Sequence, residues 1–193
     1  MKKIVCITGG MGSGKSTVAR FLVEAGFAVY NSDTRAKELM LLEPVRGQIE
    51  YLLGPSAYLN NELLNRQFLA DQIFTHPEKK GALEAIVHPA VRADFEHWLG
   101  RAKGSVVFKE SALILETGDN SCTTVFLVDC PVNTRFQRVK QRNPDWTNED
   151  IQARLDHQLT DVERRNSSSI IIDNSGSIET LKMSLDQALD KCI

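Results

Sequence analysis

The 193-residue chain lacks the features that mark membrane, secreted and nucleic-acid-binding proteins. No apolar run approaches the roughly 20 residues that a bilayer crossing needs, and the apolar run after Met1 is too short for a signal peptide. Its 23 Lys and Arg residues face 25 Asp and Glu residues, for a net charge of −2. The surface therefore lacks the positive charge that a row of nucleic-acid phosphates requires. These absences predict a cytoplasmic protein that binds neither membranes nor nucleic acid.

The four cysteines form no recognisable metal or redox motif. There is no C-x-x-C pair and no spacing typical of zinc ligands among them; they are Cys6, Cys122, Cys130 and Cys192. Cys6 lies within an apolar run, where a buried thiol behaves as a small hydrophobic side chain. We therefore expect all four cysteines to be reduced, as is usual in the cytosol.

The start of the chain has the pattern of a βαβ unit. A continuous apolar run over residues 3–8 predicts a strand buried on both faces. Apolar residues then recur at helical spacing up to Gly26, at Val18, Phe21, Leu22 and Ala25. Residues 27–30 predict a second strand. Because the strands are joined by a crossover helix, the sheet is expected to be parallel.

The next stretch, residues 34–103, has helical periodicity almost throughout. Helix ends are predicted at Pro44, Gly54 and Pro77, and an interruption of the last helical pattern is predicted at Pro89. About seventy residues between successive sheet strands are far more than one crossover helix needs. We therefore expect a helical insertion, which is where specificity is usually added to a fold.

After the insertion the sheet is expected to resume within one domain covering residues 1–193. Three further strands are predicted, at residues 105–108, 124–128 and 169–172. The core of the domain is accordingly predicted at residues 1–33, 104–134 and 166–193. Thr147 and Asp150 have the spacing of a capping box, which predicts the start of a helix running through Ile151, Leu155 and Val162.

A glycine-rich loop follows the first predicted strand. Residues 9–17 satisfy the pattern G-x-x-x-x-G-K-[ST], with Gly9, Gly14, Lys15 and Ser16 at the specified positions. Glycines allow main-chain N–H groups to surround phosphate oxygens, and the start of the next helix adds unpaired N–H groups and a partial positive charge. Lys15 supplies a cation for the β- and γ-phosphates, and the Ser16 hydroxyl is a ligand for Mg²⁺.

The alternative to a phosphate site is a simple glycine-rich turn. An accidental match would occur in roughly one chain of this length in a hundred, and the match lies between a predicted strand and a predicted helix. We therefore predict nucleotide binding. The loop residues expected to contact ATP are Gly10, Met11, Gly12, Ser13, Gly14, Lys15, Ser16 and Thr17.

Basic residues gather on a helix expected after Pro131. The spacing of Arg135, Arg138 and Arg142 puts them on one helix face. Arginines above a phosphate loop can neutralise the charge that develops during phosphoryl transfer. A solvated basic surface is the alternative, and the residues alone leave both open.

Acidic residues follow several of the predicted strands. Asp33 comes directly after the second strand, at the edge of a parallel sheet where ligands bind. There it can orient or deprotonate an attacking hydroxyl or hold Mg²⁺ through water, or it can be the N-cap of the next helix. Glu110 and Asp129, at later strand ends, are weaker candidates for the surroundings of the metal.

Several classes of nucleotide-binding protein share such a loop. A switch GTPase is disfavoured because the chain has no Asn-Lys-x-Asp sequence. A small-molecule kinase, such as a nucleoside monophosphate kinase, remains open. So does a non-catalytic nucleotide-dependent switch or binding module.

Further segments carry a closer resemblance to a known family. They are residues 7–19, Leu64-Asn65-Arg66, residues 86–91 with His88-Pro89, Leu113-Ile114-Leu115-Glu116, Arg138-x-x-x-Arg142, His157-Gln158 and residues 172–176. Through them the chain resembles the dephospho-CoA kinase family over nearly its whole length. It departs from the family pattern at Asn31, Asn65, Ala112 and Ser168-Ser169, and the two asparagines stand where the family has aspartate.

The resemblance implies a fold and a reaction. The fold would be a P-loop NTPase-like parallel β-sheet flanked by helices, with a helical substrate-binding insertion at residues 34–103 and a helical lid at residues 135–165. The reaction would be ATP-dependent phosphorylation of the ribose 3′-hydroxyl of 3′-dephospho-CoA, the last step of coenzyme A biosynthesis, with Mg²⁺ as cofactor. A monomer is the default expectation.

The resemblance also implies roles for individual residues. Lys15, Asp33 and Arg142 would be catalytic. Arg138, Arg142 and Asn174 would bind ATP together with the loop, and Ser16 would bind the metal. The acceptor would be bound by Asp33, Arg66, His88 and Glu116. Taken alone, His88 can also be a capping or core histidine, and Glu116 a structural carboxylate.

Overall fold

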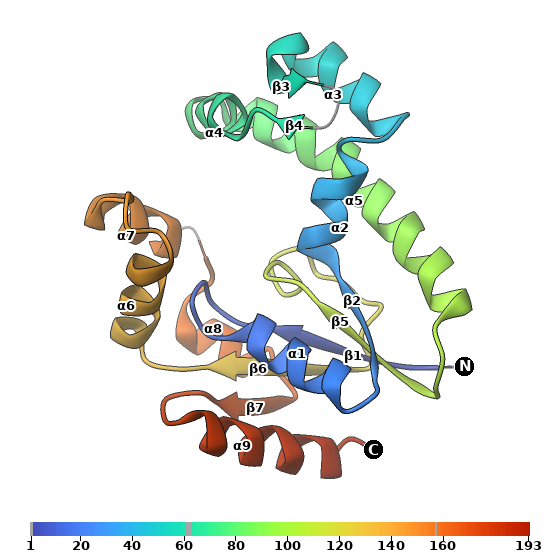
Figure 1. Ribbon diagram of the computed structural model, residues 1–193, viewed down its shortest axis with the longest axis vertical. Coiled ribbons are helices and arrows are strands. Elements are labelled where there is room, and N and C mark those ends of the chain that lie inside the picture. The colour runs from blue at the N-terminus through green and yellow to red at the C-terminus, as the bar shows by residue number, and fades with distance from the viewer. Residues whose placement is uncertain (1, 61–62, 157) are drawn as a thin grey trace. The chain divides into compact units, whose positions relative to one another are not determined.

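The computed structural model describes residues 2–60, 63–156 and 158–193 (Figure 1). The chain folds into two compact units, the first formed by Met1–Tyr30 with Ala102–Ile193 and the second by Asn31–Arg101. The second unit overlaps the stretch of residues 34–103, in which a helical insertion is expected. His157, quoted in the family resemblance, lies outside the described residues. Within the described part of the chain, no helix is long and apolar enough to span a membrane.

A five-stranded sheet has the order β2-β5-β1-β6-β7. Its strands are β1 (Lys3–Thr8), β2 (Ala28–Asn31), β5 (Val106–Glu110), β6 (Thr124–Asp129) and β7 (Ile170–Asp173). The pairs β1–β5, β1–β6 and β6–β7 are all parallel. The predicted parallel α/β fold is thus confirmed, and β5 lies between the two strands of the first βαβ unit, β1 and β2.

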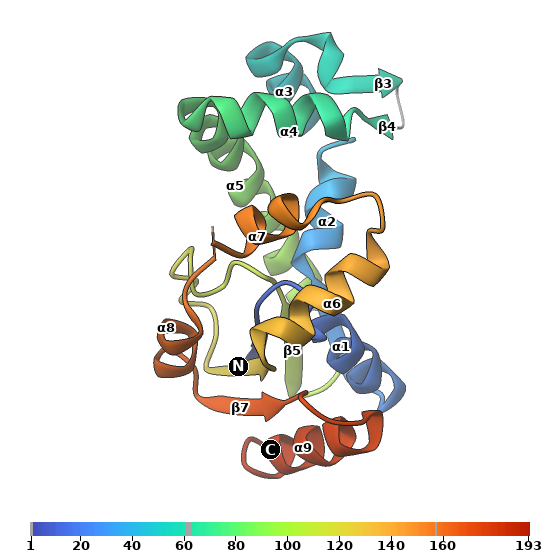
Figure 2. The ribbon, with the colours of Figure 1, turned by 90° about the vertical axis from the view of Figure 1, so that its left-hand side faces the viewer.

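Two helices complete the main core of the first unit. They are α1 (Lys15–Glu24) and α9 (Ile178–Asp190), which contact each other (Figures 1 and 2). Their apolar faces bury Leu22 and Leu181 in one cluster with Ile7 of β1 and Phe126 of β6. The apolar periodicity of both helices therefore serves to cover the sheet.

Three further helices of the first unit follow β6. They are α6 (Val132–Arg142), α7 (Asn148–Asp156) and α8 (Asp161–Asn166). The capping box at the start of α7 is confirmed, because the Thr147 N–H donates to Asp150 Oδ2 at 3.0 Å and the Asp150 N–H donates to Thr147 Oγ1 at 3.1 Å. The single helix expected through Val162 is wrong. A second capping box at Thr160 and Glu163 begins α8 as a separate helix.

The second unit is helical, as predicted, but it also contains a hairpin. Its elements are α2 (Ser32–Leu39), α3 (Val45–Leu53), the 3-10 helix η1 (Pro55–Ala57), β3 (Tyr58–Asn60), β4 (Leu63–Leu64), α4 (Arg66–Thr75) and α5 (Pro77–Arg101). β3 and β4 are antiparallel. The Tyr58 hydroxyl donates to the Met40 carbonyl at 2.6 Å, and burial raises the pKa of Tyr58 to about 12.

The interruption expected at Pro89 is wrong. α5 runs without interruption from Pro77 to Arg101, and Pro89 lies inside it. Pro89 removes one main-chain hydrogen bond, but Val87 and Phe95 on either side of it are buried at 9% and 3% exposure. Burial of apolar side chains on both sides of Pro89 stabilises the helix against this loss.

Both asparagines that depart from the family pattern are helix N-caps. Asn31 Oδ1 accepts the Thr34 N–H at 2.8 Å at the start of α2. Asn65 Oδ1 accepts the Phe68 N–H at 3.2 Å at the start of α4. Asparagine and aspartate cap helices about equally well, so these positions keep their structural role without a negative charge. The N-cap role considered for Asp33 is filled by Asn31.

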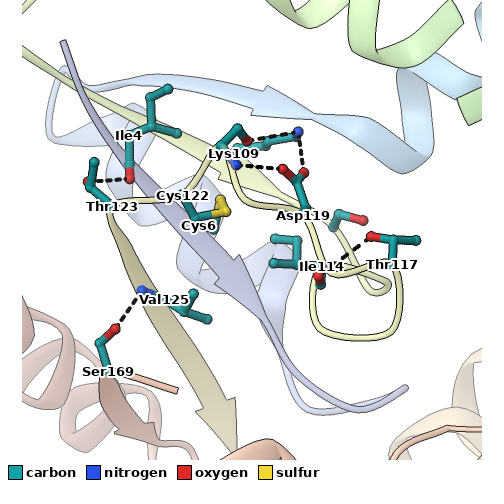
Figure 3. Close-up of a disulfide and its surroundings, with 12 residues drawn as sticks. Ile4, Cys6, Lys109, Ile114, Thr117, Asp119, Cys122, Thr123, Val125 and Ser169 are labelled. Atoms are coloured by element: carbon teal, nitrogen blue, oxygen red, sulfur yellow. Dashed lines mark hydrogen bonds and ion pairs between the residues drawn. A yellow bond between two sulfur atoms is a disulfide. The ribbon is translucent and has the colours of Figure 1, made fainter. Parts of the chain in front are cut away.

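The expectation that all four cysteines are reduced is wrong for two of them (Figure 3). Cys6 on β1 and Cys122, just before β6, form a disulfide with a Cα–Cα distance of 5.6 Å. β1 and β6 are neighbours in the sheet, so residues 116 apart in sequence come within bonding distance. Cys130 and Cys192 are free and buried.

The segment that leads to Cys122 is held by polar contacts as well (Figure 3). Lys109 Nζ pairs with Asp119 Oδ2 at 2.6 Å, and Thr123 Oγ1 donates to the Ile4 carbonyl at 2.7 Å. Burial would raise the pKa of Asp119, but hydrogen bonds from Lys109 and Ser121 outweigh it and hold that pKa below its ordinary value. The disulfide and these polar contacts therefore hold the same segment before β6.

We predict that reduction of the Cys6–Cys122 disulfide destabilises the protein. The bond closes a loop that constrains the unfolded chain, a contribution of about 2–4 kcal/mol to the free energy of unfolding. Urea denaturation with and without reductant measures the difference. In a Cys6→Ala, Cys122→Ala double variant the reductant should have no effect. Equal stability of the native protein in both conditions would contradict the prediction.

Candidate active site

The glycine-rich loop joins β1 to α1 and comes very close to its neighbours. Gly12 and Gly14 have φ values of +81° and +100°, which L-residues with side chains rarely adopt. A Cβ atom on Gly14 would lie 2.1 Å from Asn174 Nδ2, and one on Gly12 would lie 2.6 Å from the Arg135 carbonyl oxygen. The pattern of glycines is therefore required by both backbone conformation and space.

Lys15 is buried at the start of α1, with 9% of its surface exposed. Its Nζ donates to the carbonyl oxygens of Gly9 at 2.8 Å and Gly10 at 3.2 Å. The ammonium group thus lies against the loop whose amides are expected to surround phosphate oxygens. A phosphate oxygen carries a negative charge that a carbonyl oxygen lacks, so the ammonium group gains Coulombic attraction when phosphate replaces the carbonyls as its acceptor.

Ser16 and Glu110 provide oxygen atoms where a magnesium site is predicted. Ser16 Oγ donates to Glu110 Oε1 at 3.4 Å, and Glu110, at the end of β5, is 3% exposed. No group of three or more His, Cys, Asp or Glu residues that could hold a metal occurs in the described part of the chain. This donor set fits Mg²⁺, which takes one or two protein oxygens and completes its shell with phosphate and water.

Asp129, the other weaker acidic candidate, is engaged in an ion pair. Its Oδ2 accepts from Arg165 Nε at 2.7 Å. That hydrogen bond raises the pKa of Arg165 above its ordinary value. Of the two later strand ends, the one that carries Glu110 is therefore the better fit for a place beside the metal.

Two residues predicted to bind ATP meet beside the loop. Asn174 is 6% exposed, and its Nδ2 donates to the Ser13 carbonyl at 2.6 Å. Arg138 Nη2 donates to the Asn174 carbonyl at 3.1 Å, and its Nη1 lies 3.6 Å from Cys130 Sγ. Burial raises the pKa of the Cys130 thiol, although the nearby arginines oppose this effect. Arg138 and Asn174 thus contact each other beside the phosphate loop.

The three arginines of α6 differ in exposure. Arg135 is 4% exposed, Arg138 is half-buried and Arg142 is exposed. The alternative of a solvated basic surface is wrong for Arg135, whose Nη2 donates to Asp161 Oδ1 at 2.6 Å. Arg142 makes no hydrogen bond or ion pair with the residues that the structure describes, so its guanidinium group is available to a ligand.

The helices of the predicted lid contact the loop through Met11. The Met11 N–H donates to Gln158 Oε1 at 2.9 Å. Its side chain packs against an apolar cluster of Val139 on α6 with Ile151 and Leu155 on α7. The family's lid glutamine, matched here by Gln158, therefore binds the main chain of the phosphate loop.

The four predicted acceptor-binding residues are all exposed. Asp33 lies in the first turn of α2, Arg66 begins α4 and His88 lies within α5, all in the second unit, while Glu116 follows β5 in the first unit. None has a hydrogen bond or ion pair with another described residue, and exposure excludes the alternative of a core histidine for His88. Their common role at one acceptor site stays a prediction.

Asp161 and Arg164 are polar residues beside the loop that sequence reasoning missed. Asp161 accepts hydrogen bonds from both Arg135 and Arg164, and Arg164 is 5% exposed. The two residues are spaced i, i+3 at the start of a capped helix, which suggests an ion pair. Nothing in that local pattern indicates burial or contact with a loop about 150 residues earlier.

Comparison with known proteins identifies relatives along the whole chain. A model of the family described as dephospho-CoA kinase matches residues 3–180. A curated dephospho-CoA kinase from Salinibacter ruber is 36% identical, and the match covers 91% of this chain and 90% of that protein. A second, from Deinococcus radiodurans, is 35% identical, and the match covers 95% of this chain and 89% of that protein. A solved Thermus thermophilus structure is 33% identical with a TM-score of 0.87, covering 100% of this chain and 98% of its own.

We predict that Gly14→Ala weakens both folding and nucleotide binding. At φ +100° an L-residue is strained, and its Cβ would clash with Asn174 Nδ2; together these effects should cost about 2 kcal/mol or more. The matched control is Gly81→Ala inside α5, where a Cβ meets nothing within 4 Å, so stability should rise by up to about 1 kcal/mol. Chemical denaturation and ADP titration measure both. Equal behaviour of the two variants would show that the loop does not need this glycine.

Proposed function

Because the chain belongs to the dephospho-CoA kinase family, we propose that it transfers the γ-phosphoryl group of ATP to the ribose 3′-hydroxyl of 3′-dephospho-CoA. The products are coenzyme A and ADP, so the reaction is the last step of coenzyme A biosynthesis. The observation that carries the proposal is the family match over residues 3–180. It is supported by the phosphate loop, whose glycines, lysine and serine have the contacts described above. We further propose that the enzyme is a monomer and is located in the cytoplasm.

The donor nucleotide is held by the phosphate loop. The main-chain amides of residues 10–17 and Lys15 Nζ bind the oxygens of the β- and γ-phosphates. Ser16, with Glu110 beside it, would hold Mg²⁺, which would neutralise charge on those oxygens. Asn174, which contacts the loop at Ser13, and Arg138, which contacts Asn174, bind the rest of ATP.

Asp33 acts on the accepting hydroxyl. The 3′-oxygen forms a bond to the γ-phosphorus, the bond from that phosphorus to the β–γ bridging oxygen breaks, and the hydroxyl proton passes to the Asp33 carboxylate or to water. The support is an exposed carboxylate, with no partner among the described residues, directly after β2. Its alternative role as N-cap is already filled by Asn31.

Arg142 and the acceptor-binding residues complete the site. Arg142 neutralises charge on the transferring phosphoryl group, as arginines do in related reactions. Arg66 pairs with the phosphates of dephospho-CoA, because guanidinium groups match phosphate oxygens in charge and geometry. His88 and Glu116 supply further polar contacts to the acceptor.

A comparison of acceptors tests the proposed function. ADP release is measured with 3′-dephospho-CoA and with AMP, GMP, CMP and UMP at equal concentrations. Turnover with dephospho-CoA should exceed turnover with any nucleoside monophosphate by roughly 100-fold or more. Turnover of a nucleoside monophosphate without turnover of dephospho-CoA would overturn the proposal and leave only the fold.

We predict that Asp33→Asn lowers kcat by about 10²- to 10⁴-fold without weakening ATP binding, because the amide cannot accept the hydroxyl proton. Initial rates and ATP titration measure the two quantities separately. Asp71→Asn, an exposed acid in the same unit, is the matched control and should keep full activity. Full activity of Asp33→Asn would remove Asp33 from the mechanism.

We also predict that Arg142→Ala lowers kcat more than it lowers ATP affinity. An arginine that meets charge formed only in the transition state contributes little to ground-state binding. The expected loss in kcat is roughly 10²- to 10³-fold. Arg20→Ala, which removes an exposed arginine of α1, should leave both quantities unchanged. A loss of affinity alone would make Arg142 a binding residue only.

A further inference from the structure

Two arginines are buried next to the phosphate loop and share one carboxylate. Arg135 on α6 is 4% exposed, and Arg164 on α8 is 5% exposed. Asp161 Oδ1 accepts from Arg135 Nη2 at 2.6 Å and also from Arg164 Nη2. The two helices belong to different segments of the first unit (Figure 1) and are joined by this contact.

The charges in this cluster do not balance. The two guanidinium groups bring two positive charges, while the Asp161 carboxylate supplies one negative charge. A buried charge is costly unless it is paired. The cluster therefore holds one excess positive charge in the interior of the first unit.

The hydrogen-bond donors do not balance either. Arg135 Nε and Arg164 Nη1 are both buried, and neither has an acceptor among the described residues. Buried N–H groups are nearly always paired in folded proteins. Two open donors on neighbouring arginines, together with one excess positive charge, are the complement of an anionic oxygen.

The cluster lies against the phosphate loop itself. A Cβ atom built on Gly10 would be 2.4 Å from Arg135 Nη1 and 3.1 Å from Arg164 Nη2. The carbonyl oxygen of the same glycine accepts from Lys15 Nζ at 3.2 Å. Three cationic side chains thus converge on Gly10.

We propose that Arg135 and Arg164 are further binding residues for the polyphosphate of the nucleotide, beside Lys15, and that Asp161 positions them. A phosphate oxygen accepts from the open N–H groups and balances the excess charge. The inference rests on the proposed nucleotide site. It adds two arginines outside the glycine-loop motif and outside the Arg138/Arg142 pair.

Calorimetric titration of full-length variants with ADP, inorganic pyrophosphate and adenosine tests this assignment. Arg135→Gln and Arg164→Gln should each weaken ADP and pyrophosphate binding by about 10- to 100-fold, because each loses a charge-assisted hydrogen bond. Adenosine, which has no phosphate, should bind as to the wild type. Arg20→Gln, which removes an exposed arginine of the same unit, should change none of the three affinities.

Asp161→Asn separates ligand binding from a purely structural role. It keeps both arginines and an oxygen atom that can accept their hydrogen bonds. It removes the negative charge that competes with phosphate for the two arginines. Pyrophosphate should therefore bind as tightly as to the wild type or several-fold more tightly. If the cluster only stabilises the fold, Asp161→Asn should instead bind pyrophosphate more weakly and have a lower melting temperature.

Several results would overturn the assignment. They are unchanged ADP affinity in both folded glutamine variants, equal losses for ADP and adenosine, and weaker pyrophosphate binding by Asp161→Asn. If the glutamine variants do not fold, Asp161→Asn alone decides. A wild-type protein that binds no ADP would instead contradict the proposed function, so the two failures are distinguishable.

Discussion

The first unit depends on one constraint: the backbone between β1 and α1 passes closer to its neighbours than a side chain would allow. A Cβ atom would lie 2.4 Å from the Val128 carbonyl oxygen at Gly9, 2.6 Å from the Arg135 carbonyl oxygen at Gly12 and 2.1 Å from Asn174 Nδ2 at Gly14. These neighbours belong to β6, α6 and the turn after β7. Three separate segments are therefore packed onto one loop.

This close packing explains how the side chains around the phosphate loop are held in place. Lys15 is fixed by the carbonyls of the loop, Asn174 by Ser13, and Gln158 by Met11. Each contact joins a side chain to loop backbone, so a change in the loop also affects α1, the segment before α8 and the turn after β7. Phosphoryl transfer relies mostly on positioning and charge, and a loop held from several sides provides both.

Local patterns in the sequence predicted the parts of the molecule that local physics determines. Continuous apolar runs identified the strands, and the glycine pattern between strand and helix identified the phosphate loop. The misses involve partners far apart in sequence. The β3–β4 hairpin, the unbroken α5 at Pro89, the Cys6–Cys122 disulfide and the burial of Arg164 each depend on packing against residues that periodicity does not reveal.

The central claim is that this loop and Lys15 hold the phosphates of a nucleotide. A crystal structure of the full chain with ADP tests it most directly. The account predicts that Lys15 Nζ leaves the carbonyls of Gly9 and Gly10 and lies within about 3 Å of a phosphate oxygen, with loop amides around the β-phosphate. ADP bound elsewhere, or Lys15 still bonded to both carbonyls beside a bound phosphate, would contradict it.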